Sequence, residues 1–257
     1  MRLTLSQAIF LFFAGALGGA MNAVAGGGSF VAFPALLFTG VAPISANATN
    51  TVSLWVGTAV STRAYRKHLK LPKRIIVPLL AMSLIGGLAG ALLLIKTPAH
   101  TFLRVIPWLM LAATLLFAFG RRLTGQLSAG ISHEAGARAI AVAALFELVV
   151  AIYGGYFGGG IGMMNLAMLA ALGMTDIHAM NALKVIFVSA INGIAAATFV
   201  ATGAIMWPQA LVMIAGAGLG GYSGAHYAQK LPQRLVRAMV LAIGAGMTTY
   251  FFMKAYR

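Results

Sequence analysis

Long apolar segments alternate with short polar connections along the whole chain. Ten apolar segments can be distinguished, and they lie approximately at residues 3–25, 30–41, 47–62, 75–95, 102–120, 139–157, 163–173, 181–202, 208–229 and 235–253. Most of them approach the ~20 residues that a helix needs to cross a ~30 Å hydrocarbon core. Strict alternation of apolar and polar residues is absent, which disfavours a membrane β-barrel. The pattern predicts an all-α, polytopic membrane protein with ten helical elements.

Two of the ten segments, 30–41 and 163–173, are too short to span a membrane. A helix of twelve residues is only about 18 Å long. Each short segment follows a glycine cluster, Gly26-Gly27-Gly28 in the first case and Gly158-Gly159-Gly160 with Gly162 in the second. We therefore expect about eight complete spans and two short helices that are broken off by glycine.

The composition supports a membrane protein and excludes several other classes. Apolar residues make up 61% of the chain and charged residues 8%, whereas soluble domains are near half apolar and a quarter charged. The net charge of +15 comes from basic residues placed between apolar segments, not along one face. This distribution fits the positive-inside rule better than nucleic-acid binding. Cysteine is absent, so disulfides and thiolate chemistry are excluded.

The sequence contains an internal repeat with an offset near 134 residues. The sequence GGLAGA at 86–91 corresponds to GGYSGA at 220–225, and the same offset aligns Asn47 with Asn181 and Asn50 with Lys184. An offset of 133 pairs the two glycine clusters and also Gly40 with Gly173. We expect two transmembrane repeats, 1–120 and 138–257, that are joined by a polar linker at 121–137.

The distribution of basic residues predicts that the two repeats insert in opposite directions. The connection 63–74 holds six basic residues and should be cytoplasmic, whereas its counterpart 202–207 has no charge and should be outside. Five elements per repeat, an odd number, lead to the same conclusion and place both termini outside. Lys96 and Arg104, which then lie outside, fit this topology least well. Inverted repeats with glycine-broken helices are typical of secondary transporters, which bind substrate near the bilayer midplane.

Each repeat carries the same order of a glycine cluster, a short helix, a turn and a polar helix start. Backbone N–H groups and the helix dipole at such starts favour anions. Ser29 and Asn47 are candidates for N-caps. Alternatively, the glycines only allow close packing and the polar residues only cap helices. The candidate substrate-binding residues are Gly26, Gly27, Gly28, Ser29, Asn47, Thr49, Asn50 and Thr51 in the first repeat, and Gly159, Gly160, Gly162, Asn181 and Lys184 in the second.

Few charged residues lie within the apolar segments. Lys184 is a functional candidate because intramembrane charges usually face a cavity or a partner. It could instead reach the membrane surface, or pair with Asp176 or Glu147. Glu147 and His178 are candidates for proton coupling, although both could be structural. With three acidic residues in the chain, a cation site or a metal site is disfavoured, and we expect no cofactor.

No motif indicates an enzyme or a primary pump. A nucleophile, base and orienting acid do not occur at a recognisable spacing, and a Walker A sequence is absent. A membrane-embedded enzyme therefore has no support from the sequence.

Four stretches carry a resemblance to a known family. Residues 22–34 (NAVAGGGSFVAFP) followed by 46–51 (ANATNT), and residues 154–162 (GGYFGGGIG) followed by 179–184 (AMNALK), resemble the sulfite exporter TauE/SafE family. The resemblance implies a permease of the bacterial inner membrane for sulfite, organosulfonates such as sulfoacetate, and related anions. Family members are described with about eight crossings, which fits eight spans and two short helices. Leu183-Lys184 stands where the first repeat has Thr49-Asn50, so the predicted site is asymmetric.

The expected function is export of sulfur-containing anions by alternating access. Two other functions stay open at this point: an importer or proton-coupled exchanger of the same anions, and a non-transporting membrane scaffold. The expected partners are the anion and the lipid bilayer, without nucleic acid. A homodimer is also left open.

Overall fold

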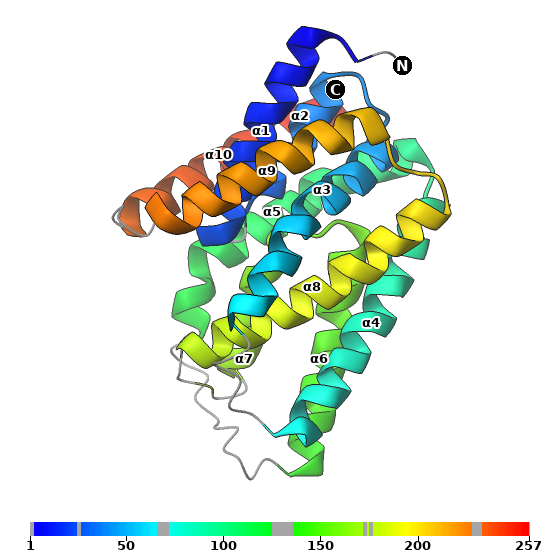
Figure 1. Cartoon of the computed structure of the whole chain (residues 1–257). Coiled ribbons are helices and arrows are strands. Elements are labelled where there is room, and N and C mark those ends of the chain that lie inside the picture. Colours follow the sequence, from blue (N-terminus) through cyan, green and yellow to red (C-terminus); the bar gives the residue numbers. More distant parts are fainter. Residues whose placement is uncertain are drawn as a thin grey trace.

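The structure is a computed structural model, which describes residues 3–24, 27–65, 72–124, 136–171, 174, 177–227 and 233–256. This part of the chain is entirely helical (Figure 1). The ten helices are α1 (Leu5–Val24), α2 (Ser29–Phe38), α3 (Pro43–Tyr65), α4 (Lys73–Lys96), α5 (Ala99–Thr124), α6 (Ala137–Tyr156), α7 (Ile161–Ala171), α8 (Ile177–Ala201), α9 (Trp207–Tyr227) and α10 (Gln233–Tyr256). Each predicted apolar segment corresponds to one helix, which confirms the all-α prediction.

The main differences from the prediction lie at helix starts. Helices α3 and α8 begin at Pro43 and Ile177, four residues before the apolar segments that indicated them. Hydropathy does not detect a polar first turn, and proline at the first helical position favours helix initiation. The prediction that Ser29 and Asn47 are N-caps is wrong. Ser29 is already helical behind Gly28, without a side-chain cap, and Asn47 lies in the second turn of α3.

Helix α1 begins with a reciprocal cap. The Gln7 N–H donates to Thr4 Oγ1 at 3.3 Å, and the Thr4 N–H donates to Gln7 Oε1 at 3.2 Å. This is a capping box, which satisfies donors that a helix start otherwise leaves unpaired. The first apolar segment is therefore a helix with a defined beginning.

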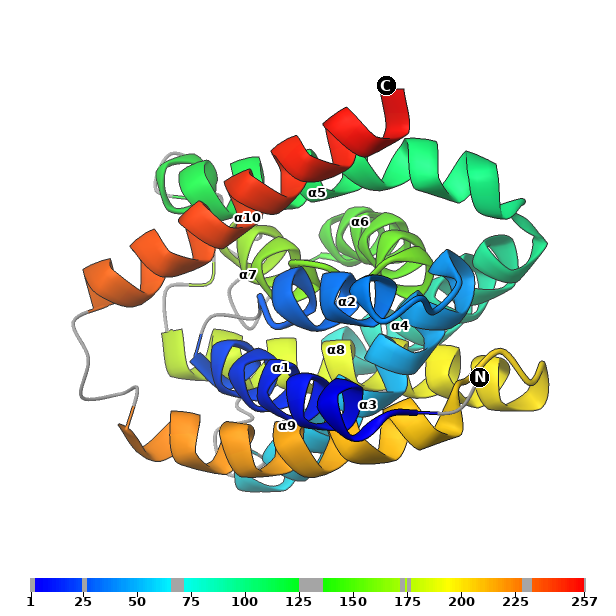
Figure 2. The same cartoon turned by 90° about the horizontal axis from the view of Figure 1, so that it is seen from above.

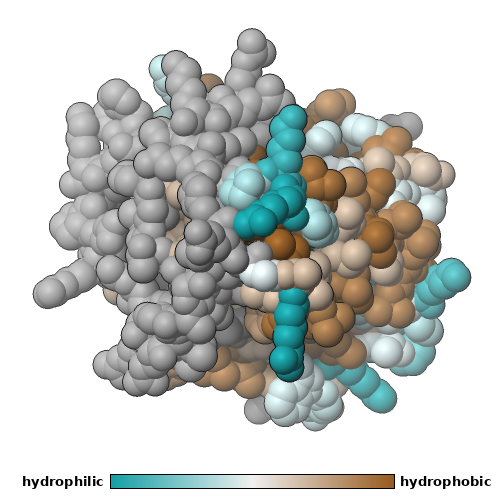
Figure 3. Space-filling view, turned by 90° about the horizontal axis from the view of Figure 1, so that it is seen from below, coloured by the Kyte–Doolittle hydropathy of each residue, from teal (hydrophilic) through white to brown (hydrophobic). Residues whose placement is uncertain are grey.

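Helix length separates the complete spans from the two short helices. Eight helices have 20–26 residues, while α2 has 10 and α7 has 11. Four of the long helices, α1, α4, α6 and α8, also meet a strict apolarity criterion for membrane spans within the described residues. Large apolar side chains such as Leu84 and Ile85 on α4 and Leu145 and Phe146 on α6 are exposed. On the described part of the face in Figure 3, hydrophobic residues cover a broad area, and several hydrophilic side chains stand among them and at its edge.

Small residues allow two helix pairs to pack very closely. Gly19 on α1 faces the Ala217 backbone on α9, and Gly220 on α9 faces the Ala16 backbone on α1. On the second pair, α4 and α6, Gly90 and Gly155 similarly face the backbone of the opposite helix. A Cβ atom at any of these glycines would overlap that backbone. Such contacts are typical of helix packing in lipid.

The helix contacts of the first half recur in the second half. In this correspondence α1 is equivalent to α6, α3 to α8, α4 to α9 and α5 to α10. Helix α1 packs on α9 as α6 packs on α4, and α3 packs on α9 as α8 packs on α4. Helices α3 and α8 pack on each other, as do α5 and α10. At the α3–α8 contact, Trp55 Nε1 donates to the Ser189 carbonyl at 3.0 Å, and these two residues are separated by the repeat offset of 134. Contact between equivalent residues is what a pseudo-twofold relation between two repeats produces.

The two short helices lie inside this arrangement. Helix α2 packs on α1, α3 and α10, and α7 packs on α5, α6 and α8 (Figure 2). Phe33 of α2 contacts the rings of Phe102, Phe157 and Phe251, at centroid distances between 5.7 and 6.3 Å. Figure 1 places both termini at the same end of the molecule. Their side of the membrane stays a prediction.

Candidate functional site

Polar side chains on α3 connect this helix to both glycine segments, Gly26–Gly28 and Gly158–Gly162. Asn47 Nδ2 donates to the carbonyl of Tyr156 at 3.0 Å, at the end of α6 just before the second glycine segment. Asn50 Nδ2 donates to Ser29 Oγ at 3.1 Å, at the start of α2 just after the first glycine segment. Residues three apart lie on the same face of a helix. One face of α3 therefore holds the breaks of both halves of the chain.

The two asparagines also present unused hydrogen-bond acceptors. Asn47 is 0% and Asn50 1% exposed, and the Oδ1 atom of each has no partner among the described residues. A buried polar atom without a partner is costly, so it usually marks a water, an ion or a ligand. The Oδ1 atoms are available to accept a hydrogen bond from a bound molecule or from its water.

The side chains of the two neighbouring threonines already form hydrogen bonds within the protein. Thr49 Oγ1 accepts from the Met206 N–H at 3.0 Å, immediately before α9, and Thr51 Oγ1 donates to the Asn47 carbonyl at 2.9 Å. Both side chains are buried. In this conformation Thr49 holds the start of α9 against α3, and Thr51 supports the turn that carries Asn47. Contact of either residue with substrate stays a prediction.

The second glycine segment owes its glycines to backbone conformation. Gly158 and Gly160 have φ values of +75° and +76°, a region that other residues rarely adopt. The Tyr153 hydroxyl donates to the Gly159 carbonyl at 2.6 Å, which fixes the loop against α6. Gly159, Gly160 and Gly162 are buried, and no hydrogen-bond acceptor for their N–H groups is found among the described residues. Unpaired N–H groups at a helix start form a site for oxyanions.

The first glycine segment owes its glycines to packing. Gly26 lies outside the described residues, whereas Gly27 and Gly28 are buried. The φ of Gly28 is −57°, an ordinary helical value, but a Cβ atom there would overlap the Gly18 backbone of α1. The two glycine segments thus correspond in sequence and differ in what requires glycine.

Lys184 is held within α8. Its Nζ donates to Asn181 Oδ1, one turn earlier, at 3.0 Å, and the side chain is half-buried. The alternative pair with Glu147 is not formed, because the carboxyl of Glu147 bonds to Ser83. Asp176 lies outside the described residues.

The predicted site residues therefore fall into two clusters. The first contains Ser29, Asn47 and Asn50 with the second glycine segment, and the second contains Asn181 with Lys184 at the start of α8. Helices α3 and α8 lie side by side but begin at opposite ends (Figure 1).

Of the two candidates for proton coupling, the structure describes the side chain of Glu147. Glu147 is fully buried on α6 and bonds to Ser83 of α4 at 2.5 Å. His178 lies in the first turn of α8, and its side chain is outside the described part of the structure.

Sequence reasoning missed two buried carboxamides. Asn165 on α7 and Gln209 on α9 are 0% exposed, and neither the oxygen nor the nitrogen of their amides has a partner in the described structure. Both are carboxamides within apolar stretches, which is itself a functional signal in a membrane protein. They are further candidates for contact with water or substrate.

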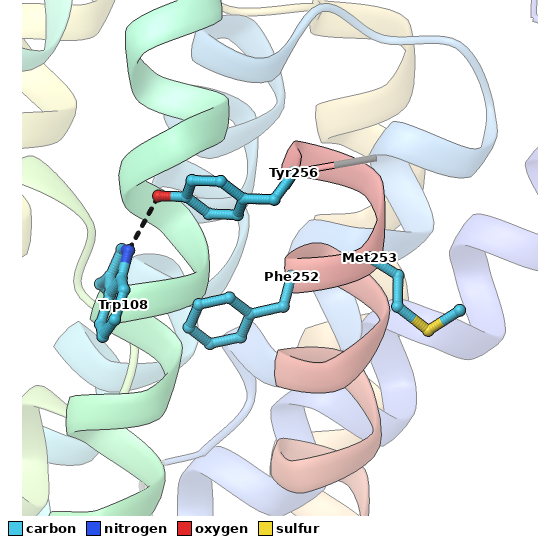
Figure 4. A pocket seen from close by; sticks show the side chains of 4 residues that line it. All are labelled: Trp108, Phe252, Met253 and Tyr256. Atoms are coloured by element: carbon cyan, nitrogen blue, oxygen red, sulfur yellow. Dashed lines mark hydrogen bonds between the residues drawn. The ribbon is translucent and has the colours of Figure 1, made fainter.

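An outer pocket between α5 and α10 does not have the chemistry of an anion site. Trp108, Phe252, Met253 and Tyr256 line it, and its walls are apolar (Figure 4). Trp108 Nε1 donates to the Tyr256 hydroxyl at 2.9 Å, and that hydroxyl donates to the Arg104 carbonyl at 3.1 Å. Tryptophan and tyrosine of this kind are typical of the membrane–water interface.

Comparisons with known proteins give one consistent assignment. Three similar proteins carry the description probable membrane transporter protein. The one from Haemophilus influenzae is 29% identical over 239 residues, 93% of this chain and 91% of that protein. ORF9 of a Sinorhizobium species is 27% identical over 244 residues, 93% and 89% of the two chains, and YfcA of Escherichia coli is 27% identical over 242 residues, 93% and 87%. No solved structure matches the chain.

The family comparison covers nearly the whole molecule. The model described as sulfite exporter TauE/SafE matches residues 11–251, which include both glycine segments and all ten helices at least in part. Together with the helical architecture, this match confirms the resemblance seen in the sequence. The chain belongs to the sulfite exporter TauE/SafE family of membrane transporters.

Proposed function

We propose that the protein exports sulfur-containing anions, such as sulfite or an organosulfonate like sulfoacetate, across the inner membrane. The observation that carries this proposal is the buried start of α7. The N–H groups of Gly159, Gly160 and Gly162 are unpaired in the described structure and lie next to the loop that Asn47 holds. Tetrahedral and trigonal oxyanions bind to such groups of backbone donors.

The surrounding side chains complement an anion that keeps part of its hydration. The Oδ1 atoms of Asn47 and Asn50 accept hydrogen bonds, so they suit a water on the anion or an S–OH group of a protonated one. Lys184 contributes positive charge from α8, and Asn181 orients it. The site thus uses neutral donors close to the anion and one cation from the second cluster.

Alternating access follows from the repeat. The exchange symmetry of helix packing and the Trp55–Ser189 contact support two repeats, 1–120 and 138–257, in inverted orientation. In such transporters, one repeat moves against the other around a central site. A homodimer is compatible with this mechanism and is not required by it.

Export needs no additional energy source. Moving one net negative charge out of a negative interior releases about 2.3 kcal/mol per 100 mV. A uniporter for an anion therefore runs outward on the membrane potential alone. Import would require coupling to a second gradient.

The test uses purified protein reconstituted into liposomes. Sulfite, thiosulfate, sulfoacetate, taurine and sulfate are first ranked by the thermal stabilisation that each gives in detergent. We expect at least one sulfur-containing anion to stabilise the protein and to be transported towards the positive side of an imposed potential. Transport that responds only to a proton gradient would favour the importer or exchanger. Absence of both binding and transport for all five would favour the scaffold.

A further inference from the structure

A buried carboxyl group and a hydroxyl group join α4 to α6 within the bundle. Glu147 of α6 and Ser83 of α4 are both 0% exposed, and Glu147 Oε1 lies 2.5 Å from Ser83 Oγ. The second carboxyl oxygen, Oε2, is buried and has no partner in the described structure. The proposed anion site uses neither residue.

The hydrogen-bond geometry around Ser83 suits a protonated carboxyl group. Ser83 Oγ lies within hydrogen-bond distance of two oxygens, Glu147 Oε1 and the Leu79 carbonyl at 3.0 Å, but it has one proton to donate. Both contacts are hydrogen bonds when Glu147 carries a proton and donates to Ser83, while Ser83 donates to Leu79. With an ionised carboxylate, Ser83 donates to only one of its two neighbouring oxygens, and the buried Oε2 carries negative charge without any donor, which is costly in an apolar interior.

The charged groups on the surrounding helices do not neutralise this carboxyl. Helix α6 packs on α4, α7 and α8. On α4, the cations Lys73, Arg74 and Lys96 are exposed and lie near the helix ends, and the α7 sequence has no titratable residue. On α8, Lys184 donates to Asn181, and His178 lies at the helix start. On α6 itself, Arg138 is exposed, and the Tyr153 hydroxyl donates to Gly159.

The equivalent helix pair of the other repeat packs without such polar groups. Helices α1 and α6 correspond at an offset of 132, and α9 and α4 at 134, so Gly15 and Ala217 stand where the second pair has Glu147 and Ser83. Gly15 lies against the backbone of Met213 there. The acid and the hydroxyl are therefore not a requirement of this type of helix packing.

Helix α6 also connects Glu147 to the anion site. Nine residues separate Glu147 from Tyr156, whose carbonyl Asn47 holds, which is about 14 Å along the helix. Two like charges at about that distance, in a medium with an effective dielectric constant near 20, change each other's binding roughly fivefold or more. Because such coupling is reciprocal, an anion favours the protonated form of Glu147, and protonated Glu147 favours the anion.

From this geometry we propose that Glu147 is the proton-binding residue of the transporter, and that its proton binds and moves together with the anion. Ser83 is the positioning residue that holds the carboxyl group. With this proton the protein is a proton–anion symporter and not a simple uniporter. For a dianion such as sulfoacetate, one proton leaves one net negative charge, so the membrane potential still favours export, while an acidic exterior opposes it. The inference rests on the proposed function, since it requires an anion substrate.

The experiment compares wild type with Glu147→Gln, which keeps size and hydrogen bonding but cannot release a proton. Sulfoacetate affinity is measured by calorimetry across the neutral pH range, in which sulfoacetate itself does not titrate. We expect the wild-type affinity to fall roughly fivefold from the acidic to the alkaline end, with proton uptake on binding, because an ionised Glu147 repels the anion. Glu147→Gln should keep the high affinity at every pH. His178→Gln, which removes the other candidate, should keep the wild-type pH profile.

Charge movement gives an independent result. In liposomes, wild type should move one net charge per sulfoacetate and Glu147→Gln two, while Ser83→Ala should displace the pH profile without abolishing it. A flat wild-type profile, a pH response that Glu147→Gln retains, or equal charge movement in both proteins would overturn the proposal. If instead no anion binds to wild type at any pH, the proposed function itself fails.

Discussion

At the scale of single residues, two buried amides of α3 connect this helix to the glycine segments of both halves of the chain. Asn47 and Asn50 stand out because they are amides in an apolar segment, and the structure buries both at the two glycine segments. That Asn47 bonds to the Tyr156 carbonyl, 109 residues away, depends on the packing of α3 against another repeat, which no local pattern contains. The error over Ser29 and Asn47 as caps has the same origin, because Asn side chains that serve caps locally can serve distant carbonyls as well.

Asn47 offers the first prediction at this scale. Asn47→Leu removes the bond to the Tyr156 carbonyl and leaves that buried acceptor unpaired, which should cost about 1–3 kcal/mol of stability. The loop at Gly158–Gly160 should lose its position, so anion-dependent stabilisation should fall more than the melting temperature alone explains. Thermal melts with and without sulfoacetate measure both effects. Unchanged stabilisation by the anion in Asn47→Leu would contradict this role.

Lys184 gives the second prediction. If its ammonium faces the anion, Lys184→Ala removes a charge-assisted hydrogen bond worth about 1.5–3 kcal/mol. This corresponds to a roughly tenfold to hundredfold loss of affinity. Lys184→Arg should also bind less well, since its guanidinium is larger and directed differently.

Two control variants separate this role from a structural one. Asn181→Ala removes the bond that orients Lys184 but keeps the charge, so it should weaken binding less than Lys184→Ala. The double variant Lys184→Ala with Asp176→Ala tests the ion pair that the sequence allows. Wild-type affinity in Lys184→Ala, or its complete recovery in the double variant, would remove Lys184 from the site.

At the scale of elements, hydropathy and glycine were sufficient to predict the number and kind of helices. The short apolar segments 30–41 and 163–173 predicted two short helices, and the structure confirms both as α2 and α7. Helix starts were less predictable, because the first turn of α3 is polar and begins at Pro43. The sequence also did not reveal why each glycine is required. Gly28 is required by a close backbone contact and Gly160 by a left-handed conformation, and a sequence cannot distinguish these two reasons.

Gly160 allows a matched experiment on the α7 break. Gly160 and Gly203 both have positive φ values, +76° and +68°, so alanine at either position should cost about 1–2 kcal/mol of stability. A Cβ atom at Gly203 meets no other atom within 4 Å, whereas at Gly160 it lies 3.0 Å from the Ala113 Cβ, beside the unpaired N–H groups. Gly160→Ala should therefore lose most of its transport at nearly wild-type expression, and Gly203→Ala should keep it. Equal transport by the two variants would mean that Gly160 serves the backbone conformation alone and not the anion site.

At the scale of the whole molecule, the division into two inverted repeats stays a prediction, and one contact supports it. The offset of 134 was visible in GGLAGA and GGYSGA, and the structure places Trp55 and Ser189, separated by the same offset, in contact. What the sequence could not provide is the separation of the site into two clusters. Aligned positions such as Asn50 and Lys184 were expected to face one cavity, but α3 and α8 begin at opposite ends, so equivalent residues near their starts lie apart.

The orientation of the repeats in the membrane is the last prediction. If the chain consists of two repeats of five elements that are related by a pseudo-twofold axis in the membrane plane, the repeats insert in opposite directions. The loop with the most basic residues then sets the sides. Reporter fusions within 63–74 and 121–138 should report the cytoplasm, and fusions within 202–207 and after Arg257 should report the outside. Figure 1 places both termini at one end, so a fusion at either terminus should give the same answer. A cytoplasmic C-terminus together with a cytoplasmic 63–74 loop would require an even number of crossings per repeat, and the inverted arrangement, with the export mechanism built on it, would have to be abandoned.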